Sequence, residues 1–268
     1  IHTYSYSARL ENMNMLGKEI YAEKIGGVPY RQGIFSAWND PAKFGLFQHA
    51  ALMTRRGDVQ EAKNTVEIRP ISKHMHDWTA AHENVEVSRV IANYDFKEFA
   101  EDREWPAGRT ESLSDTGELY RSWGKNYGYI NTPKTKCAYG FLLKNGKQDL
   151  SGVSIDCHTD FATIAMSSLT DADITKSDNI LLTAVGRAEN TDAKFEGDLM
   201  LDIGKPPVLI EVIEADITID TEVEGLKVWA VSPEGFYIGT LPTKHENGKL
   251  SFTIGKEAQS MYYLIVKE

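Results

Sequence analysis

Two β-type runs in the middle of the chain constrain its fold more than any other feature. They cover residues 161–168 and 179–186, and a polar connector rich in Asp, Ser and Thr separates them. In the first run, Phe161, Thr163 and Ser167 alternate with residues such as Ile164, so small residues stand on both faces. This pattern predicts a strand inside a packed all-β domain. The ionisable groups lie in the connectors, so we expect the stretch to be structural.

From Ser112 onward the sequence predicts an antiparallel β-sandwich, because short strands recur regularly with turn signals between them. The turns at residues 232–235 and at Asn247-Gly248 predict that the last four strands are antiparallel neighbours. Besides the two central runs, strands are expected at residues 119–123, 127–131, 137–143, 198–203, 208–213, 217–221, 226–231, 236–241, 250–254 and 261–266.

The N-terminal part has α/β character. Ile1 to Ser7 alternates as a strand does, and Asp40 with Pro41 can begin a helix. Arg55, Arg56 and then Gly57 form a helix stop, so the Arg56-Gly57-Asp58 triplet needs no role as a cell-adhesion motif. The apolar face expected of this helix is Phe44, Phe47, Ala51 and Leu52. Residues 1–66 therefore form a short α/β segment, residues 67–111 a connecting region, and residues 112–268 the sandwich.

Charge and composition exclude two classes of partner. The formal net charge of the 268 residues is −10, and no stretch collects the Lys and Arg that nucleic-acid phosphates require. No apolar run approaches the length of about 20 residues that a membrane span needs. Because the chain opens on strand-like alternation without Met, we expect it to be a piece of a longer protein.

Cysteine and histidine spacing predicts neither a cofactor nor a metal site. Cys137 and Cys157 lie in separate strand-like runs, where two buried free thiols are favoured over a cross-strand disulfide. His74 and His76 form an H-x-H pair that could bind zinc with His82, Asp77 and Glu83. A solvated loop is the favoured interpretation of that segment.

Three groups of segments resemble one enzyme family. Residues 1–7, Trp38-Asn39-Asp40-Pro41 and residues 50–59 resemble the end of a clan-A (β/α)8-barrel glycoside hydrolase, of the agarase-like or cellulase-like multidomain bacterial kind. Residues 114–119, 131–136 and 168–190 resemble the β-sandwich appended to such barrels. The resemblance implies the last β/α unit of a barrel followed by a supporting sandwich.

The same resemblance implies that this chain holds no catalytic residue. Clan-A barrels use two carboxylates at the ends of the fourth and seventh strands. If Ile1 to Ser7 is the eighth strand, both carboxylates precede residue 1. An independent acid pair could come from Glu11, Glu19 and Glu23, or from Asp156 and Asp160, but surface solvation is the favoured explanation of these residues.

Aromatic residues are the remaining candidates for a site. Tyr4, Tyr6 and Trp38 would lie at the top of the last barrel strand, where aromatic rings can stack on sugars. Filling the barrel interior is the favoured role for these rings. A second possible sugar platform comprises Trp105, Trp123, Tyr127 and Tyr129.

Three functions are therefore weighed. The first is the C-terminal accessory portion of a polysaccharide-degrading glycoside hydrolase, inactive alone, whose partners are carbohydrate or the missing N-terminal barrel chain. It also predicts self-association through the open edge of the barrel strand Ile1 to Ser7. The alternative is a stand-alone carbohydrate-binding sandwich with exposed, coplanar aromatic rings, and the third is a structural surface protein. An extracellular or cell-surface location is favoured.

Overall fold

The computed structural model describes residues 42–60, 64–70, 85–92, 111–114, 116–122, 124–196, 199–232 and 235–268. The expected strand at residues 1–7 therefore lies outside the described residues, as do the histidines at positions 74, 76 and 82. The chain divides into two compact units, residues 1–58 with 129–268, and residues 59–128. The predicted connecting region, residues 67–111, falls within the second unit, and the predicted domain boundaries stay predictions.

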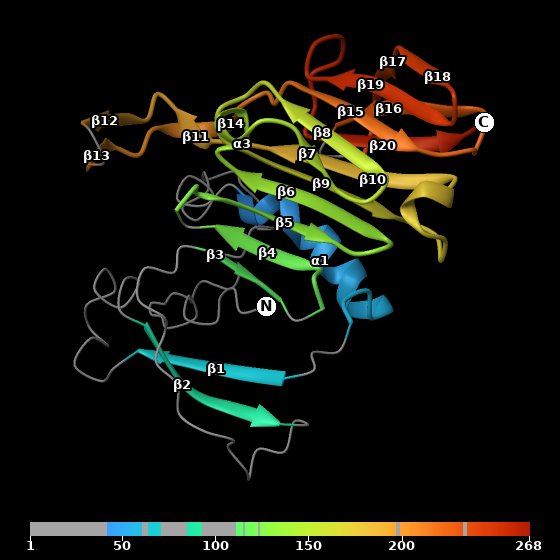
Figure 1. Cartoon of the computed structure of the whole chain (residues 1–268). Coiled ribbons are helices and arrows are strands. Elements are labelled where there is room, and N and C mark those ends of the chain that lie inside the picture. The colour runs from blue at the N-terminus through green and yellow to red at the C-terminus, as the bar shows by residue number, and fades with distance from the viewer. Residues whose placement is uncertain are drawn as a thin grey trace. The chain divides into compact units, whose positions relative to one another are not determined.

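The first unit is built on a large antiparallel sheet with the strand order β17-β16-β20-β10-β9-β6-β5. β5 begins in the second unit and continues into the first. The central strands β9 and β10 are the two runs that the sequence places at the centre of the fold (Figure 1). The strands of this sheet are β5 (Tyr127–Asn131), β6 (Thr135–Gly140), β9 (Ala162–Ser168), β10 (Asn179–Val185), β16 (Leu226–Val231), β17 (Tyr237–Leu241) and β20 (Tyr262–Lys267).

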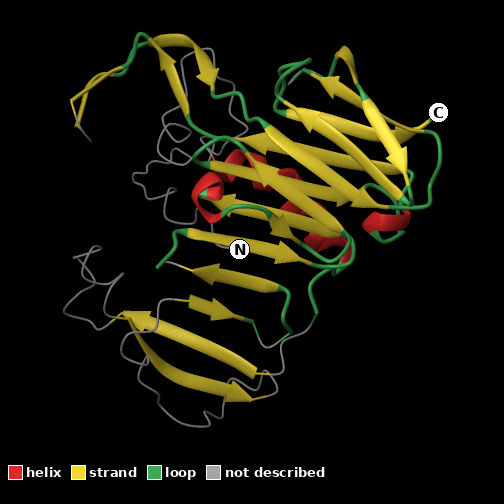
Figure 2. Cartoon of the chain, turned by 45° about the horizontal axis from the view of Figure 1, so that its top comes forward, coloured by secondary structure: helices red, strands yellow, loops and turns green. Residues whose placement is uncertain are grey.

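A smaller antiparallel sheet lies over one face of the large one, as the two layers in Figure 2 show. Its strand order is β18-β19-β15-β8-β7. Its strands are β7 (Gln148–Asp149), β8 (Val153–Cys157), β15 (Ala215–Asp220), β18 (Thr243–Glu246) and β19 (Lys249–Ile254). The predicted fold class is confirmed, since the chain is mainly β with two antiparallel sheets packed as a sandwich.

Burial explains why strands of the two sheets have different patterns of apolar and polar residues in the sequence. In β15 the apolar residues Ala215, Ile217 and Ile219 are buried and the alternate residues are half-buried or exposed, as expected of a sheet with one solvated face. In β9 every residue is buried, because the small sheet covers one face and the helix α1 (Ala42–Arg56) contacts the other. The prediction that residues 161–168 form an interior strand is thus confirmed.

Shorter elements complete the two units. The first unit also contains the one-turn helix α3 (Leu142–Asn145), the 3-10 helix η5 (Ile174–Lys176) and two ribbons, in which β11 (Ala188–Thr191) pairs with β14 (Lys205–Ile210) and β12 (Lys194–Glu196) with β13 (Leu199–Asp202). The second unit contains two antiparallel pairs, β1 (Asn64–Pro70) with β2 (Val85–Ala92) and β3 (Glu111–Leu113) with β4 (Leu119–Ser122).

Two predicted strand assignments are wrong in part. The last four predicted strands are not all neighbours, because β19 belongs to the small sheet while β16, β17 and β20 belong to the large one. The chain crosses between the sheets at Pro242 and then forms the hairpin β18–β19, whose two-residue turn Asn247-Gly248 has positive φ at both positions. The strand expected to reach residue 143 instead ends at Gly140, and α3 follows.

The prediction for the two cysteines is confirmed. Cys137 on β6 and Cys157 on β8 are both buried and free, and the two strands belong to different sheets. Burial raises the pKa of Cys137 to about 12 and that of Cys157 to about 11, so neither thiol forms the reactive thiolate near neutral pH.

Candidate functional site

Helix α1 presents a polar side chain to the sheet where its sequence predicts an apolar face. The helix contacts β6, β9 and β10, and it buries His49 completely and Met53 almost completely. Ala51, which the sequence assigns to the buried face, is exposed, so that assignment is wrong. The residues of α1 that contact the sheet are the buried His49 and Met53 and the half-buried Arg56, spaced at i, i+4 and i+7.

His49 bonds to hydroxyl groups on two neighbouring strands. Its Nδ1 lies 2.8 Å from Ser167 Oγ on β9, and its Nε2 lies 2.8 Å from Thr183 Oγ1 on β10. Burial lowers the pKa of His49 to about 3, with a further contribution from the positive charge of Arg56. The imidazole is therefore neutral at physiological pH.

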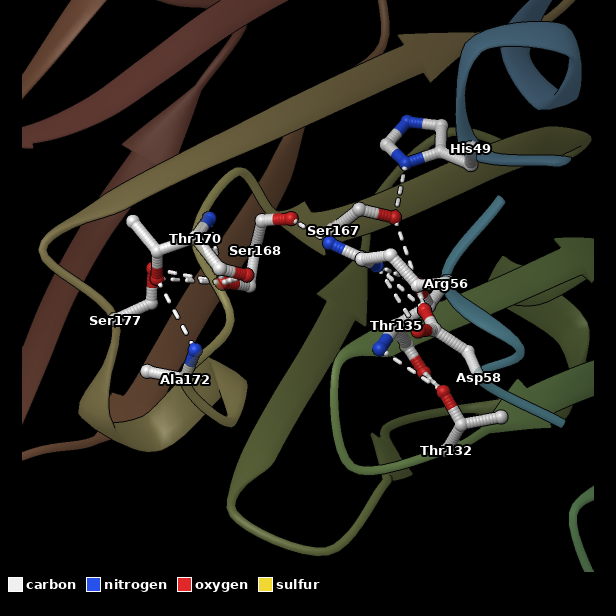
Figure 3. A network of polar contacts seen from close by, with 10 residues as sticks. All are labelled: His49, Arg56, Asp58, Thr132, Thr135, Ser167, Ser168, Thr170, Ala172 and Ser177. Carbon is white, nitrogen blue, oxygen red and sulfur yellow. Dashed lines mark hydrogen bonds and ion pairs between the residues drawn. The ribbon is translucent and has the colours of Figure 1, made fainter. Parts of the chain in front are cut away.

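The end of α1 adds an ion pair to the same group of side chains (Figure 3). The Arg56 Nε donates to Asp58 Oδ1 at 2.9 Å, and the other arm of the guanidinium donates to the carbonyl oxygen of Ser168. Asp58 Oδ2 also accepts from Thr135 Oγ1 at 3.1 Å, and Thr135 Oγ1 lies 2.8 Å from Ser167 Oγ. The group His49, Arg56, Asp58, Thr135, Ser167 and Thr183 is called the α1 polar cluster below.

The protons of the α1 polar cluster can be assigned by counting donors. Thr135 has one O–H proton and donates it to the Asp58 carboxylate, so its oxygen must accept from Ser167. Ser167 has then used its own proton and accepts from Nδ1–H of His49, which leaves Nε2 to accept from Thr183. The hydrogen bonds thus all run in one direction, from Thr183 through His49, Ser167 and Thr135 to the carboxylate of Asp58. His49 carries its proton on Nδ1.

The cluster contains a serine beside a histidine, yet its geometry does not suit nucleophilic catalysis. A catalytic serine gives its proton to the histidine and must reach a substrate. Here the proton of Ser167 points to Thr135, and the side chains of Ser167, Thr183 and His49 are fully buried. The arrangement instead fixes the helix on the sheet, since the buried side chains of His49, Ser167 and Thr183 are hydrogen-bonded to one another across the helix and the two strands.

The Arg56-Gly57-Asp58 triplet is engaged inside the protein. The Asp58 side chain is 1% exposed and that of Arg56 is 12% exposed. The backbone N–H of Asp58 donates to the carbonyl of Met53, five residues earlier, and Gly57 has φ +64°, as in a Schellman helix end. The predicted helix stop is confirmed, and the buried carboxylate is not presented for adhesion.

Replacing Gly57 with alanine should lower the free energy of unfolding by about 1 kcal/mol, because an L-residue is strained at a left-handed φ. A Cβ at this position meets no atom within 4 Å, so the strain should come from the backbone alone. Urea denaturation measures the difference. Gly239→Ala is the matched control, since its Cβ would lie 4.0 Å from Ala258 Cβ and φ there is not positive. Equal stabilities of the two variants would contradict the strained helix end.

Two turns position the strands that carry the cluster. Thr132 and Thr135 close the turn before β6, with Thr135 N–H donating to Thr132 Oγ1 at 3.0 Å and Thr132 Oγ1 donating to the Thr135 carbonyl at 3.1 Å. In the connector after β9, Ser168 Oγ donates to Ser177 Oγ at 3.0 Å, and Ser177 Oγ donates to the Asn179 carbonyl at 2.9 Å. The Ser and Thr residues of this connector are thus turn residues.

Of the acidic residues considered as a catalytic pair, Glu11, Glu19 and Glu23 lie outside the described residues, and Asp156 and Asp160 have different surroundings. Asp160 bonds to Arg187 at 3.3 Å, and both side chains are more than half exposed. Asp156 stands opposite Asp216 in the register of β8 and β15. Hydrogen bonds from Thr253 and His158 lower the pKa of Asp216. Among the described residues, no group of three or more His, Cys, Asp or Glu side chains is placed to hold a metal ion.

The aromatic candidates are only partly described. Tyr4, Tyr6 and Trp38 lie outside the described residues, as do Trp105 and Trp123. Tyr127 and Tyr129 are half-buried. The ring planes in described aromatic pairs are inclined to each other, by 58° in Tyr120–Tyr127, 69° in Phe141–Phe161 and 77° in Trp229–Tyr237. None of these three pairs forms the coplanar platform that the binding-module alternative predicts.

The α1 polar cluster was not predicted from the sequence as a site. Its available signal is the helical spacing of His49, Met53 and Arg56, combined with the hydroxyl residues on one face of β9. No helix in the described part of the chain has the length and apolarity to cross a membrane. Comparisons with protein-family models, with curated proteins and with solved structures find no match.

Proposed function

We propose that this chain is the C-terminal accessory portion of a polysaccharide-degrading glycoside hydrolase, in which the sandwich supports the last β/α unit of a barrel. The chain has no catalytic role of its own in this proposal, because the acid/base and nucleophile carboxylates would precede residue 1. Tyr4, Tyr6 and Trp38 remain the proposed sugar contacts.

The α1 polar cluster is the observation that supports this proposal. The segments that resemble the hydrolase family include residues 50–59, 131–136 and 168–190. Arg56 and Asp58 come from the first of these, Thr135 from the second and Thr183 from the third, and hydrogen bonds join them through His49 and Ser167. The segments that carry the resemblance are thus those that fasten a helix to the sandwich, as a support domain requires.

The intact mass of the natural product, together with the coding region upstream of Ile1, tests the proposal. We expect a longer protein whose upstream region encodes the preceding β/α units, with a carboxylate at the ends of the fourth and seventh strands. The longer protein should release reducing ends from agarose or carboxymethylcellulose, and the present chain alone should release none.

A paired variant makes the supporting role measurable. In the longer protein, Asp58→Asn should lower the temperature at which hydrolysis is lost, whereas Asp160→Asn, in an exposed ion pair, should leave it unchanged. Hydrolysis by the present chain alone would contradict the proposal. Retarded migration of this chain in a polysaccharide-containing gel, with no barrel encoded upstream, would favour the carbohydrate-binding alternative.

A further inference from the structure

Lys136 on β6 differs from the other lysines in its surroundings. It is 3% exposed, and it is the only buried lysine among the residues whose burial the structure describes. Successive side chains of a strand point to opposite faces, so Lys136 faces the small sheet, away from the α1 polar cluster in which Thr135 lies. Within the described part of the chain, no carboxylate lies at ion-pair distance from its Nζ. Four exposed lysines do have such a partner, namely Lys205, Lys227, Lys244 and Lys249.

A single neutral group accepts a hydrogen bond from Lys136. Its Nζ donates to Oδ1 of Asn131, at the end of β5, at 2.7 Å. Asn131 Nδ2 donates in turn to Oγ of Ser151, in the turn between β7 and β8, at 3.1 Å. Asn131 is half-buried and Ser151 is exposed, so these two side chains connect the buried amine to the surface. Among the bonds described for Ser151, none uses its own O–H proton, which is therefore available to a further acceptor.

This environment favours the uncharged form of the amine. A buried ammonium group without a carboxylate partner is costly, and Asn131 accepts as well from a neutral amine as from a charged one. Burial lowers the pKa of Lys136 to about 8, although the negative charge of Asp173 opposes the shift. At pH 8 about half of the Lys136 side chains are then free amine, whereas an exposed lysine is almost fully protonated. The free amine is the form that attacks an electrophile.

The burial of Lys136 restricts which electrophile it meets. A side chain that is 3% exposed admits a small, uncharged molecule more readily than a large or charged one. Imine formation with an aldehyde must expel water with the help of an acid, and no acid is hydrogen-bonded to Nζ within the described part of the chain. Addition to carbon dioxide expels nothing and needs no acid.

We propose that Lys136 binds carbon dioxide reversibly as a carbamate. The lone pair of Nζ forms a bond to the carbon, one π-electron pair of a C=O bond moves to its oxygen, and Nζ releases one proton to water. The carbamate keeps one N–H, which continues to donate to Asn131 Oδ1, and the Ser151 hydroxyl is the nearest described donor along the same path to the surface. This inference rests on the sandwich and is independent of the proposed hydrolase function.

Trapping the carbamate tests the proposal. The whole chain is equilibrated with 13C-bicarbonate at pH 8, alkylated with triethyloxonium, and mapped by peptide mass spectrometry. We expect an ethyl carbamate at Lys136 in the wild type and none at position 136 in Lys136→Arg. Lys134→Arg is the matched control, since Lys134 is half-buried two residues earlier, and it should keep the signal at Lys136. The α-amino group also has a pKa of about 8, so its carbamate is the internal standard in every variant.

A second pair of variants tests the electrostatic part of the inference. Asp173→Asn should raise the carbamate fraction at Lys136 by up to about twofold, because it increases the share of free amine and removes a negative charge near the carbamate. Asp171→Asn, at an exposed position in the same connector, should leave the fraction unchanged. Far-UV circular dichroism shows that each variant is folded. A wild type that carries the carbamate on its α-amino group but not on Lys136 would overturn the proposal. Equal labelling of Lys134 and Lys136, or a lower fraction in Asp173→Asn, would overturn it as well.

Discussion

The Asp58→Asn variant should be less stable than the wild type by about 3 kcal/mol, because it leaves a largely buried guanidinium without its carboxylate. Asp58 Oδ1 and Oδ2 face only donors, namely Arg56 Nε, the terminal guanidinium nitrogen and Thr135 Oγ1. An asparagine amide placed there points an NH2 group at one of these donors in either orientation. The variant therefore loses the charge and also breaks the order of protons in the α1 polar cluster.

Urea denaturation followed by circular dichroism measures this loss. Asp160→Asn is the matched control, because Asp160 also pairs with an arginine but at the surface, with side chains 52% and 56% exposed. The control should change the free energy of unfolding by less than about 0.5 kcal/mol. If both variants were equally stable, Asp58 would not hold the end of α1, and the support given to the proposed function would be lost.

The strands of the sandwich could be predicted from the sequence because their patterns are local. β9 is covered on both faces, and its sequence shows small residues on both faces. β16 was predicted with its observed bounds, and its alternating burial matches its sequence. Which sheet each strand joins could not be predicted in the same way. In the sequence, the hairpin β18–β19 has the same pattern as any other pair of antiparallel strands. It belongs to the small sheet because the chain crosses between the sheets at Pro242.

The α1 polar cluster could not be predicted because its members become neighbours only in the fold. An apolar face was expected of α1 since a helix usually packs on a sheet through apolar residues. The sheet opposite α1 instead presents the hydroxyls of Thr135, Ser167 and Thr183, and a neutral histidine satisfies two of them where an alanine or leucine would satisfy none. His49 and Arg56 of the helix face the sheet because the surface of the sheet is polar there. The sequence of the helix alone carries no information about that surface.

Acidification should destabilise the protein through His49. Its pKa is about 3 in the folded state and is expected near 6.5 in the unfolded chain, so between these values the unfolded state binds a proton that the folded state does not. Stability from this group is therefore complete above pH 6.5 and falls as the pH is lowered, by about 1.4 kcal/mol per pH unit once well below 6.5. At pH 5 the loss should be about 2 kcal/mol relative to neutral pH. Urea denaturation at a series of pH values from 7.5 to about 5 measures it, above the range where most carboxylates titrate.

The His49→Gln variant separates this effect from the other six histidines of the chain. It should be less stable than the wild type at pH 7, and its stability should fall less steeply with acid, because one titrating group is gone. His245→Gln is the control, since His245 lies on the edge strand β18 and the hydrogen bond described for it is to the Thr221 carbonyl. This variant should keep the wild-type dependence of stability on pH. An unchanged slope in His49→Gln would contradict the buried neutral imidazole.

Nitrogen chemical shifts of the wild type give a second test that needs no variant, because proton counting in the α1 polar cluster requires the neutral Nδ1–H tautomer at pH 6. A protonated ring at pH 6 would contradict the lowered pKa of His49. A proton on Nε2 would make Nδ1 accept from Ser167, so that Thr135 would have to give its single proton to either Ser167 or Asp58 and one of these two contacts would lose its donor.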